Sequence, residues 1–324
     1  MLSLKKFLFL ALAIIALATT IFIIYLPKIV TNMPIEFSDN RPGDLWPCKI
    51  FKVNLATFPH PEKIPPYTYS FHVNKLGFRG PEVEIKNNSK IIIILGDGYA
   101  FGNGLNSGET ISERLDIKLS DTYGKGAFVV LNAGMPGYTL TDEYSYIQKK
   151  GNKFKPNSVI LVVTNSDIWE MLRQKTMRDK MRTRMQSRWR IIKSRFIKQT
   201  GYNIYINIQN NPDKNNLSTI AFNKYILLFK KFNSMVKSWG GKIFVVLEAD
   251  QWPNLQPFFK NEGVPFIYTK NIIPCDKSYF SVKEYIAAQE KNPDLQNWYL
   301  IDGYFGRKSA DLISEELFKL NRTN

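Results

Sequence analysis

Residues 90–104, KIIIILGDGYAFGNG, decide the fold of this chain. Lys90–Leu95 is a short run rich in β-branched residues, and it lacks the alternation of a half-exposed strand. Such a run is typical of a strand buried on both faces of a parallel sheet. Four glycines in the next nine residues indicate a turn, and Glu109-Thr110 then opens a helical pattern. The sequence therefore predicts a buried strand that ends in a tight turn before a helix.

The same alternation continues to the C-terminal end of the chain. Five further apolar runs predict strands: Phe128–Leu131, Val159–Val163, Lys242–Leu247, Pro265–Tyr268 and Trp298–Ile301. Helical patterns lie between and after them: Glu109–Leu119, Leu140–Lys149, Phe222–Trp239, Ser281–Gln289 and Ser309–Leu320. We therefore expect an α/β fold, a three-layer α/β/α sandwich with a doubly wound parallel sheet, whose site lies at the carboxyl ends of the strands.

The N-terminal segment predicts a membrane anchor. Lys5 and Lys6 precede Phe7–Leu26, which is uncharged and, as a helix, about 30 Å long, the thickness of the hydrocarbon core. Lysines before the span keep the start cytoplasmic and place the bulk outside the cytoplasm, in a periplasmic or other extracytoplasmic location. The alternative is a signal peptide cleaved after Ala16-Leu17-Ala18, which would leave a strongly apolar mature end.

The composition limits which kinds of protein and which partners remain. Of 324 residues, 44% are hydrophobic, so after an anchor (1–27) and a Pro-rich lead-in or stalk (28–66) the chain can build one large domain over 67–324. A net charge of +16 would suit nucleic acid, but an extracytoplasmic location argues against that partner. Two cysteines exclude a disulfide scaffold and a Cys-built zinc site, and we expect no metal and no cofactor. Cys48 and Cys275 either form a disulfide or remain two buried thiols.

Polar and glycine residues follow four of the predicted strands. The first runs into Gly96-Asp97-Gly98, the second into 132–138 (NAGMPGY), the third into 164–168 (TNSDI) and the last into 302–305 (DGYF). In order, spacing and context these blocks resemble the SGNH (GDSL-type) hydrolases over about Asn74–Leu320. The preceding segment 74–80 (NKLGFRG) resembles the N-x-x-G-F-R-G segment of a membrane-associated bacterial branch of that family.

The resemblance implies acyl-ester hydrolysis or acyl transfer. In the family a serine of the G-D-S block attacks the carbonyl, and a histidine near the C-terminus acts as base with an aspartate shortly before it. The serine N–H, a glycine N–H of the second block and the asparagine of G-x-N-D hold the oxyanion. The corresponding positions of this chain are Gly98, Tyr304 (or Phe305 at a spacing one residue longer), Asp302, Gly137, and Ser166 with Asn165 one residue early.

Two of these positions lack the group that the chemistry needs, and a third, Ser166, holds a serine where the oxyanion asparagine is expected. Gly98 has no nucleophile, and a phenol with a pKa of about 10 at Tyr304 is a poor base. The only histidines are His60, in a Pro-flanked loop, and His72, in Tyr69–Val73, a predicted strand that enters the domain. A surface or packing role is expected for both. Asp97, Asp167, Asp302 and Gly137 keep structural roles as caps and turns, and Asp97 is also a candidate binding residue. The sequence thus predicts a degenerate triad.

A basic insertion at about 170–215 separates the third strand from the next helix. Arg173–Lys198 holds eleven Lys or Arg residues and one acid, with apolar residues at spacings of three and four, as in a basic amphipathic helix. It is either a solvated cap over the old cleft, a contact with anionic lipid, or a site for an envelope glycan or acidic protein. The candidate binding residues are Arg178, Arg182, Arg188, Trp189 and Arg190.

Three functions follow as hypotheses. The first is a pseudoenzyme that binds a polymer, lipid or partner protein at the cell envelope. The second is an esterase or acyltransferase acting on envelope acyl esters through atypical residues, as the family resemblance implies. The third is a structural subunit of a membrane complex.

Overall fold

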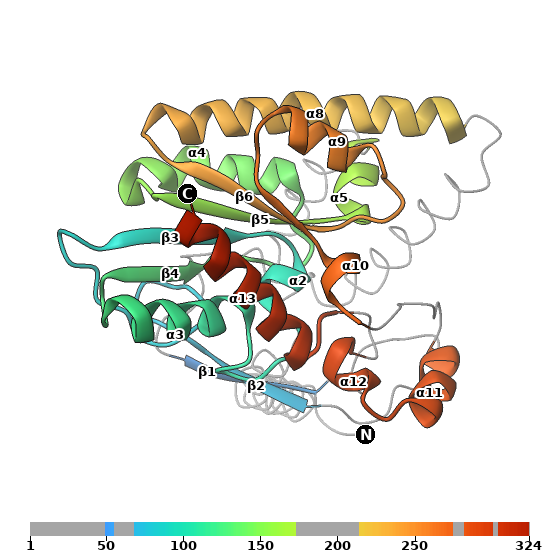
Figure 1. Ribbon diagram of the computed structural model, residues 1–324, viewed down its shortest axis with the longest axis horizontal. Helices are drawn as coiled ribbons and strands as arrows, with labels where there is room; N and C mark the ends of the chain where they lie inside the picture. Colours follow the sequence, from blue (N-terminus) through green and yellow to red (C-terminus); the bar gives the residue numbers. More distant parts are fainter. Residues whose placement is uncertain (1–48, 55–67, 173–213, 275–281, 301–303, 324) are drawn as a thin grey trace, which may run out of the picture.

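The computed structural model describes residues 49–54, 68–172, 214–274, 282–300 and 304–323. Within them, five strands form one parallel sheet in the order β4-β3-β5-β6-β7 (Figure 1). The strands are β3 (Lys90–Leu95), β4 (Phe128–Asn132), β5 (Ser158–Thr164), β6 (Lys242–Glu248) and β7 (Phe266–Tyr268). This order is the doubly wound arrangement in which the chain reverses direction across the sheet between β3 and β5. The predicted α/β/α sandwich is therefore confirmed.

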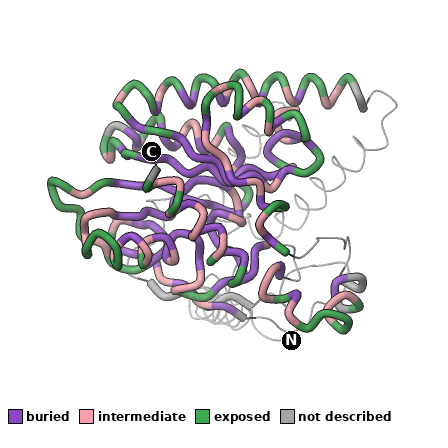
Figure 2. The backbone as a smooth tube through the Cα atoms, in the orientation of Figure 1, coloured by how far each residue is buried: buried purple, intermediate pink, exposed green. Residues whose placement is uncertain are grey.

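Alternate residues of each strand face opposite helix layers. In β3, Ile91, Ile93 and Leu95 pack into one core, while Ile92 and Ile94 pack into the other. The continuous apolar run predicted this burial, because a strand between two layers has no solvent face. Figure 2 shows the resulting buried strands in the middle of the molecule.

Two helix layers cover the sheet. The first holds α4 (Leu140–Phe154), α5 (Asn165–Trp169), η3 (Glu170–Leu172), α8 (Lys214–Ser238) and α9 (Leu255–Asn261). The second holds α3 (Ile111–Tyr123), α11 (Val282–Lys291), α12 (Leu295–Trp298) and α13 (Arg307–Thr323). The short helices α2 (Gly98–Phe101) and α10 (Thr269–Ile272) follow β3 and β7 directly. All five predicted helices are confirmed, with ends that differ by a few residues, most at the start of α8.

One predicted strand is wrong. Of Trp298–Ile301, Trp298 ends α12, Tyr299 and Leu300 lie outside the sheet, and Ile301 is outside the described residues. Here the chain folds back on itself, since Tyr299 pairs with Phe305 and the N–H of Leu300 donates to the carbonyl of Tyr304 at 2.8 Å. A run this short satisfies its backbone locally, so its apolar character alone did not determine sheet pairing.

The lead-in also differs from the expected irregular stalk. Lys49–Asn54 forms strand β1, which pairs antiparallel with β2 (Thr68–Val73). β2 agrees with the strand expected near His72, and β1 was missed because its partner is non-local. The predicted anchor at 7–26, Cys48, Cys275 and the basic segment 173–198 lie outside the described residues. In the described part of the chain, none of the helices combines the length and apolar character that a membrane crossing requires.

Candidate functional site

The carboxyl ends of β3 and β5 meet at the reversal point of the sheet, where doubly wound folds bind ligands. Asp97 follows β3, and its carboxylate accepts a hydrogen bond from the N–H of Tyr99 at 3.0 Å. This contact caps α2 and fixes the backbone of Gly98 at the first position of the helix. Asp97 is half-buried at the site, and its carboxylate has a structural role as the cap of α2.

The space beside Gly98 is filled by Tyr304. A Cβ placed on Gly98 would lie 2.6 Å from the Cε1, Cζ and Oη atoms of Tyr304, closer than real Cβ contacts come. The Tyr304 ring in turn packs edge-on against Tyr99, with ring centroids 4.9 Å apart. Phe305, the other candidate base position, is buried and lies 4.8 Å from the same Tyr99 ring. The ring of Tyr304 therefore occupies the place from which a side chain at position 98 would act.

A double-mutant cycle tests this packing. We expect Gly98→Ala to destabilise the fold by about 1 to 2 kcal/mol, because the new methyl group must displace the Tyr304 ring. In the background of Tyr304→Ala the same change should be nearly neutral, which gives a coupling energy of about 1 kcal/mol or more. Urea unfolding of the four full-length proteins measures it. Equal costs of Gly98→Ala in both backgrounds would contradict the contact.

Burial keeps the phenol of Tyr99 protonated. Burial raises the pKa of the Tyr99 hydroxyl well above its usual range, and the nearby Glu248 and Asp97 carboxylates raise it further. Tyr99 therefore stays neutral through the physiological range and accepts no proton from a nucleophile.

Residues 164–168, the block that follows β5, are arranged differently from an oxyanion site. The side-chain amide of Asn165 donates to Asp250 at 2.7 Å, and its oxygen accepts from the N–H of Gln251 at 3.1 Å. This residue thus links the ends of β5 and β6. Ser166 is exposed, and its hydroxyl lies 2.7 Å from that of Thr164. Both side chains already have protein partners.

Residues 132–138, the block at the end of β4, bring the chain close to α2. A Cβ at Gly134 would lie 2.4 Å from the backbone nitrogen of Phe101, so only glycine fits there. Gly137 is exposed at φ 78°, a conformation that favours glycine, and a Cβ there would meet nothing within 4 Å. Gly134 therefore has a packing role, while Gly137 serves a turn at the rim of the site.

Two buried carboxyls behind the site were not predicted as a pair. Glu143 of α4 and Asp167 of α5 are 1% and 2% exposed. Asp167 Oδ2 accepts from the N–H and hydroxyl of Thr164, but its Oδ1, Glu143 Oε1 and the Tyr225 hydroxyl have no hydrogen-bond partner among the described residues. Burial raises the pKa of both carboxyls well above the usual range, and neighbouring carboxylates, Asp97 among them, raise both further.

This pair predicts a fold that loses stability toward alkaline pH. A carboxyl whose pKa is raised in the fold binds a proton that the unfolded chain releases near pH 4, so stability falls as pH rises from there through the folded pKa. The fall is about 1.4 kcal/mol per pH unit for each such proton. Glu143→Gln should flatten this dependence and be more stable than wild type at about pH 8. Urea unfolding across pH measures it, with exposed Asp121→Asn as control; a wild-type profile unchanged by Glu143→Gln would contradict it.

The ends of β6 and β7 add a third group that was not predicted. Glu248 ends β6 and is half-buried. Its Oε2 accepts a hydrogen bond from the Thr269 hydroxyl, and its Oε1 accepts one from the Tyr299 hydroxyl at 3.4 Å. No sequence motif marks Glu248, since only the strand register places it beside the site. Together, Asp97, Glu248 and Asp250 make this edge of the sheet locally acidic in a basic protein.

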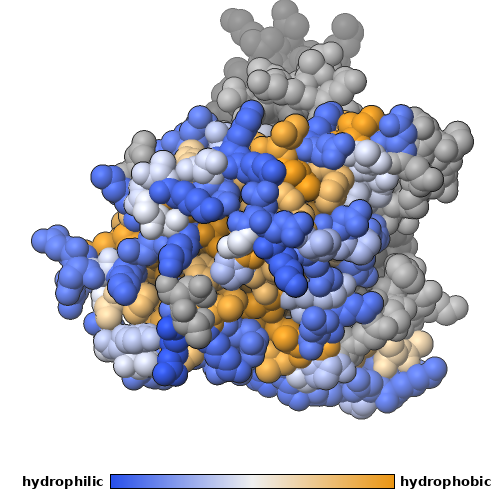
Figure 3. All heavy atoms as spheres, turned by 45° about the horizontal axis from the view of Figure 1, so that its top comes forward, coloured by the Kyte–Doolittle hydropathy of each residue, from blue (hydrophilic) through white to orange (hydrophobic). Residues whose placement is uncertain are grey.

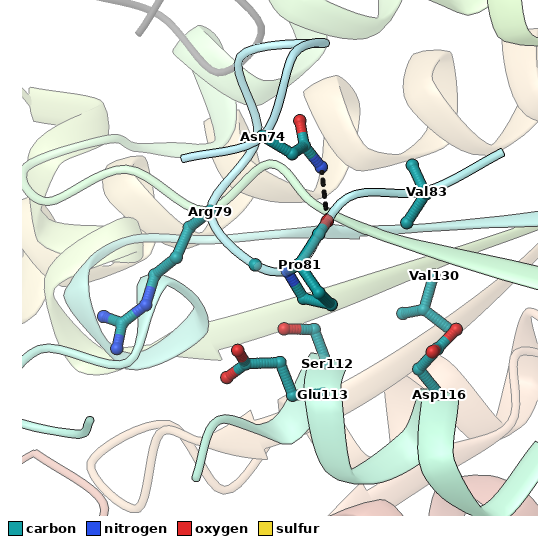
Figure 4. A pocket seen from close by; sticks show the side chains of 9 residues that line it. Asn74, Arg79, Pro81, Val83, Ser112, Glu113, Asp116 and Val130 are labelled. Carbon is teal, nitrogen blue, oxygen red and sulfur yellow. Dashed lines mark hydrogen bonds between the residues drawn. The ribbon is translucent and has the colours of Figure 1, made fainter. Parts of the chain in front are cut away.

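A small hollow lies away from these strand ends, between residues 74–83, α3 and β4. Its cavity volume is only about 10 Å³, roughly the space of one water molecule, and Figure 4 shows Asn74, Arg79, Ser112, Glu113 and Asp116 around it. Several lining groups have partners: the Asn74 amide donates to the Pro81 carbonyl at 3.2 Å, and Glu113 accepts from the Thr110 hydroxyl at 2.7 Å. The hollow therefore marks a structural junction between residues 74–83, α3 and the sheet.

Several predicted residues cannot be placed. Those outside the described residues are Asp302, Arg178, Arg182, Arg188, Trp189, Arg190, Cys48 and Cys275. The structure brings together Asp97, Gly98 and Tyr304, and it places Asn165 and Ser166 at the neighbouring strand end.

Comparison with solved structures gives similarities of fold. In fold, the chain resembles the SGNH (GDSL) hydrolases. The structure of TesA matches at 10% identity and a TM-score of 0.43, over 72% of this chain and 99% of TesA. A catalytic mutant of Axe2, an acetylxylan esterase from Geobacillus stearothermophilus, matches at 10% identity and a TM-score of 0.42, over 71% of this chain and 93% of Axe2. A member of the lipolytic G-D-S-L family from Veillonella parvula matches at 10% identity and a TM-score of 0.41, over 72% of this chain and 100% of that protein.

At these identities no functional residue is carried over from the matched structures. No protein-family model matches the sequence, and no curated protein does.

Proposed function

We propose that this chain is a catalytically degenerate SGNH-hydrolase-like protein that is anchored at the cell envelope and acts as a binding or scaffold subunit. The observation that carries the proposal is the position of Tyr304, whose ring fills the space beside Gly98. Covalent acyl transfer needs an oxygen or sulfur nucleophile at that place and a base within hydrogen-bond reach of it. Gly98 supplies no nucleophile, and the half-buried phenol of Tyr304 stands where the nucleophile would be.

The third strand end supports the same proposal. Asn165, the amide nearest to the asparagine position of the resemblance, is bonded to Asp250 and Gln251, so it is not directed at an oxyanion. Loss of any one member of such a site lowers the rate by orders of magnitude, and the losses are not additive. A fold also does not establish an activity by itself, so the reaction of SGNH hydrolases is not carried over with their fold.

An activity assay tests this proposal. We expect the purified full chain to hydrolyse neither short-chain aryl esters nor acetylated glycans above the buffer rate, and to remain unlabelled by a fluorophosphonate serine probe. A catalytically intact GDSL esterase serves as the positive control in the same detergent. Turnover that survives repurification, or a labelled serine, would overturn the proposal and support an envelope esterase or acyltransferase with atypical residues.

Copurification then separates the kinds of binding. The full chain is solubilised from its native membrane in mild detergent and analysed for stoichiometric companions. A protein partner favours a subunit of a membrane complex, and a bound glycan or lipid favours a ligand-binding role.

A further inference from the structure

The two helix layers of the fold differ sharply in charge. The helices α4 and α8 together carry eight basic and two acidic residues, whereas α3 and α13 carry six of each. Within the first layer, α8 has five lysines and no acidic residue over its 25 residues. One face of the domain is therefore strongly positive and the opposite face is balanced.

The outward ridge of α8 also exposes apolar side chains. Ile220, Lys224, Leu227 and Lys231 follow one another at spacings of four, three and four, which places them within about 60° of arc on a helix. Leu227 is 63% exposed, the most exposed large hydrophobic residue among those described, and Ile220 is 38% exposed. Phe229, on the opposite side of the helix, is fully buried.

Space-filling and burial views agree with this description. Figure 2 shows exposed turns along the outer side of α8, and Figure 3 shows hydrophobic residues among hydrophilic ones on the side turned toward the reader. Lys230 forms an ion pair with Glu262 at 3.0 Å, whereas no ion pair with an acid is found for Lys224 or Lys231 among the described residues.

We propose that the outward ridge of α8 docks on the surface of an anionic lipid bilayer. Each lysine near an anionic membrane surface contributes about 1 kcal/mol, and apolar side chains between the lysines gain free energy only where acyl chains or other apolar groups receive them. A soluble polyanion such as an acidic glycan would use the lysines but leave Leu227 and Ile220 in water. The alternation of charge and apolar surface therefore fits the headgroup–acyl boundary, as in helices that lie in the plane of the membrane.

Photo-cross-linking in lipid nanodiscs tests this proposal. The full chain carries p-benzoylphenylalanine in place of Leu227 and is present during disc assembly, so the label reports on α8 whether or not residues 7–26 insert. The matched control carries the same label in place of Ile117, which is 47% exposed on α3, on the opposite face of the sheet. Discs are made from phosphatidylcholine alone or with added anionic phosphatidylglycerol, and lipid adducts are measured by mass spectrometry.

We expect lipid adducts at position 227 in anionic discs, few in neutral discs, and few at position 117 in either. Raising the salt from about 0.1 M to about 1 M should reduce the adducts, because the Debye length falls from about 10 Å to about 3 Å. Lys224→Gln with Lys231→Gln should shift the docked-to-undocked ratio about 25-fold, or about fivefold for each lysine. Lys86→Gln with Lys125→Gln, an equal charge change at exposed sites outside α8, should leave it unchanged.

Equal adduct yields at positions 117 and 227, or no lipid adduct at 227 in anionic discs, would overturn the proposal. The latter result would point instead to an acidic protein or glycan as the partner of this ridge. Neither outcome depends on catalytic activity, so the membrane surface and the proposed function stand or fall separately.

Discussion

Replacing Arg79 by alanine should destabilise the fold by about 3 to 5 kcal/mol, the largest effect that we expect of a single substitution. The guanidinium is buried against two rings that contact each other, 4.9 Å from the centroid of Phe71 and 4.7 Å from that of Phe101. It donates to the carbonyl of Gly102 at 2.7 Å and also to that of Leu105. Alanine would leave a cavity and remove a donor from both carbonyls. The Gly102 carbonyl keeps the N–H of Leu105 at 3.0 Å, whereas the buried Leu105 carbonyl loses its Arg79 donor, at a cost of about 1 to 3 kcal/mol.

Chemical denaturation of the full chain measures this effect. Arg79→Lys should recover only part of the loss, because an ammonium neither packs as a flat group against the rings nor donates to two carbonyls through a planar fork. Arg322→Ala is the matched control: this arginine also lies over a ring, 5.8 Å from the centroid of Phe318, but it is exposed and should cost less than about 0.5 kcal/mol. A loss of stability in Arg79→Ala as small as that in Arg322→Ala would contradict the buried contacts of Arg79.

This arginine also explains how the segment 74–80 is joined to the sheet. Backbone bridges pair Arg79 with Val73 at the end of β2 and with Asn132 at the end of β4. The side chain then reaches across to the loop between α2 and α3. The segment 74–80 thus joins β2 to the strand end next to the site, a physical role for residues that the sequence marked only through a family resemblance.

The parts of the fold that could be predicted from sequence are those determined by local pattern. Lys90–Leu95 and Lys242–Leu247 are apolar along their whole length after the first lysine, so burial on both faces follows directly. The capping box of α3, Thr110 with Glu113, likewise lies within four residues. Polar residues after such strands meet at one edge of the sheet, which is why Asp97 and Asn165 were predicted near one site.

The parts that could not be predicted depend on contacts between distant segments. The family resemblance assigned Gly98 and Tyr304 to one site, but more than 200 residues separate them, and no local pattern predicts that the ring of Tyr304 fills the space beside Gly98. Glu143 and Asp167 each resemble ordinary first-turn acids of a helix, so their shared burial becomes evident only once α4, α5 and α8 are packed. The same holds for the bond of Asn165 to Asp250, which depends on the register of β5 and β6.

Restoring a nucleophile and a base together should create weak esterase activity where neither change alone does. Gly98→Ser places a hydroxyl where the Tyr304 ring now lies, so this single variant should be destabilised as well as inactive. Tyr304→His removes part of that ring and introduces an imidazole, but without serine it has nothing to activate. Because triad members act as a unit, we expect the double variant to exceed either single variant at least about tenfold in ester hydrolysis.

Steady-state hydrolysis of a short-chain aryl ester, with fluorophosphonate labelling at position 98 in the Gly98→Ser variants, measures this gain. Gly98→Ser with Tyr304→Ala is the control, because it relieves the same crowding and supplies no base; it should remain inactive. Gly98→Ser with Phe305→His tests the alternative spacing, although Phe305 is buried against Tyr99 and its replacement should cost more stability. Hydrolysis by Gly98→Ser alone at the rate of the double variant would show that a base other than residue 304 is already in place, and the degenerate site would then lack only its nucleophile.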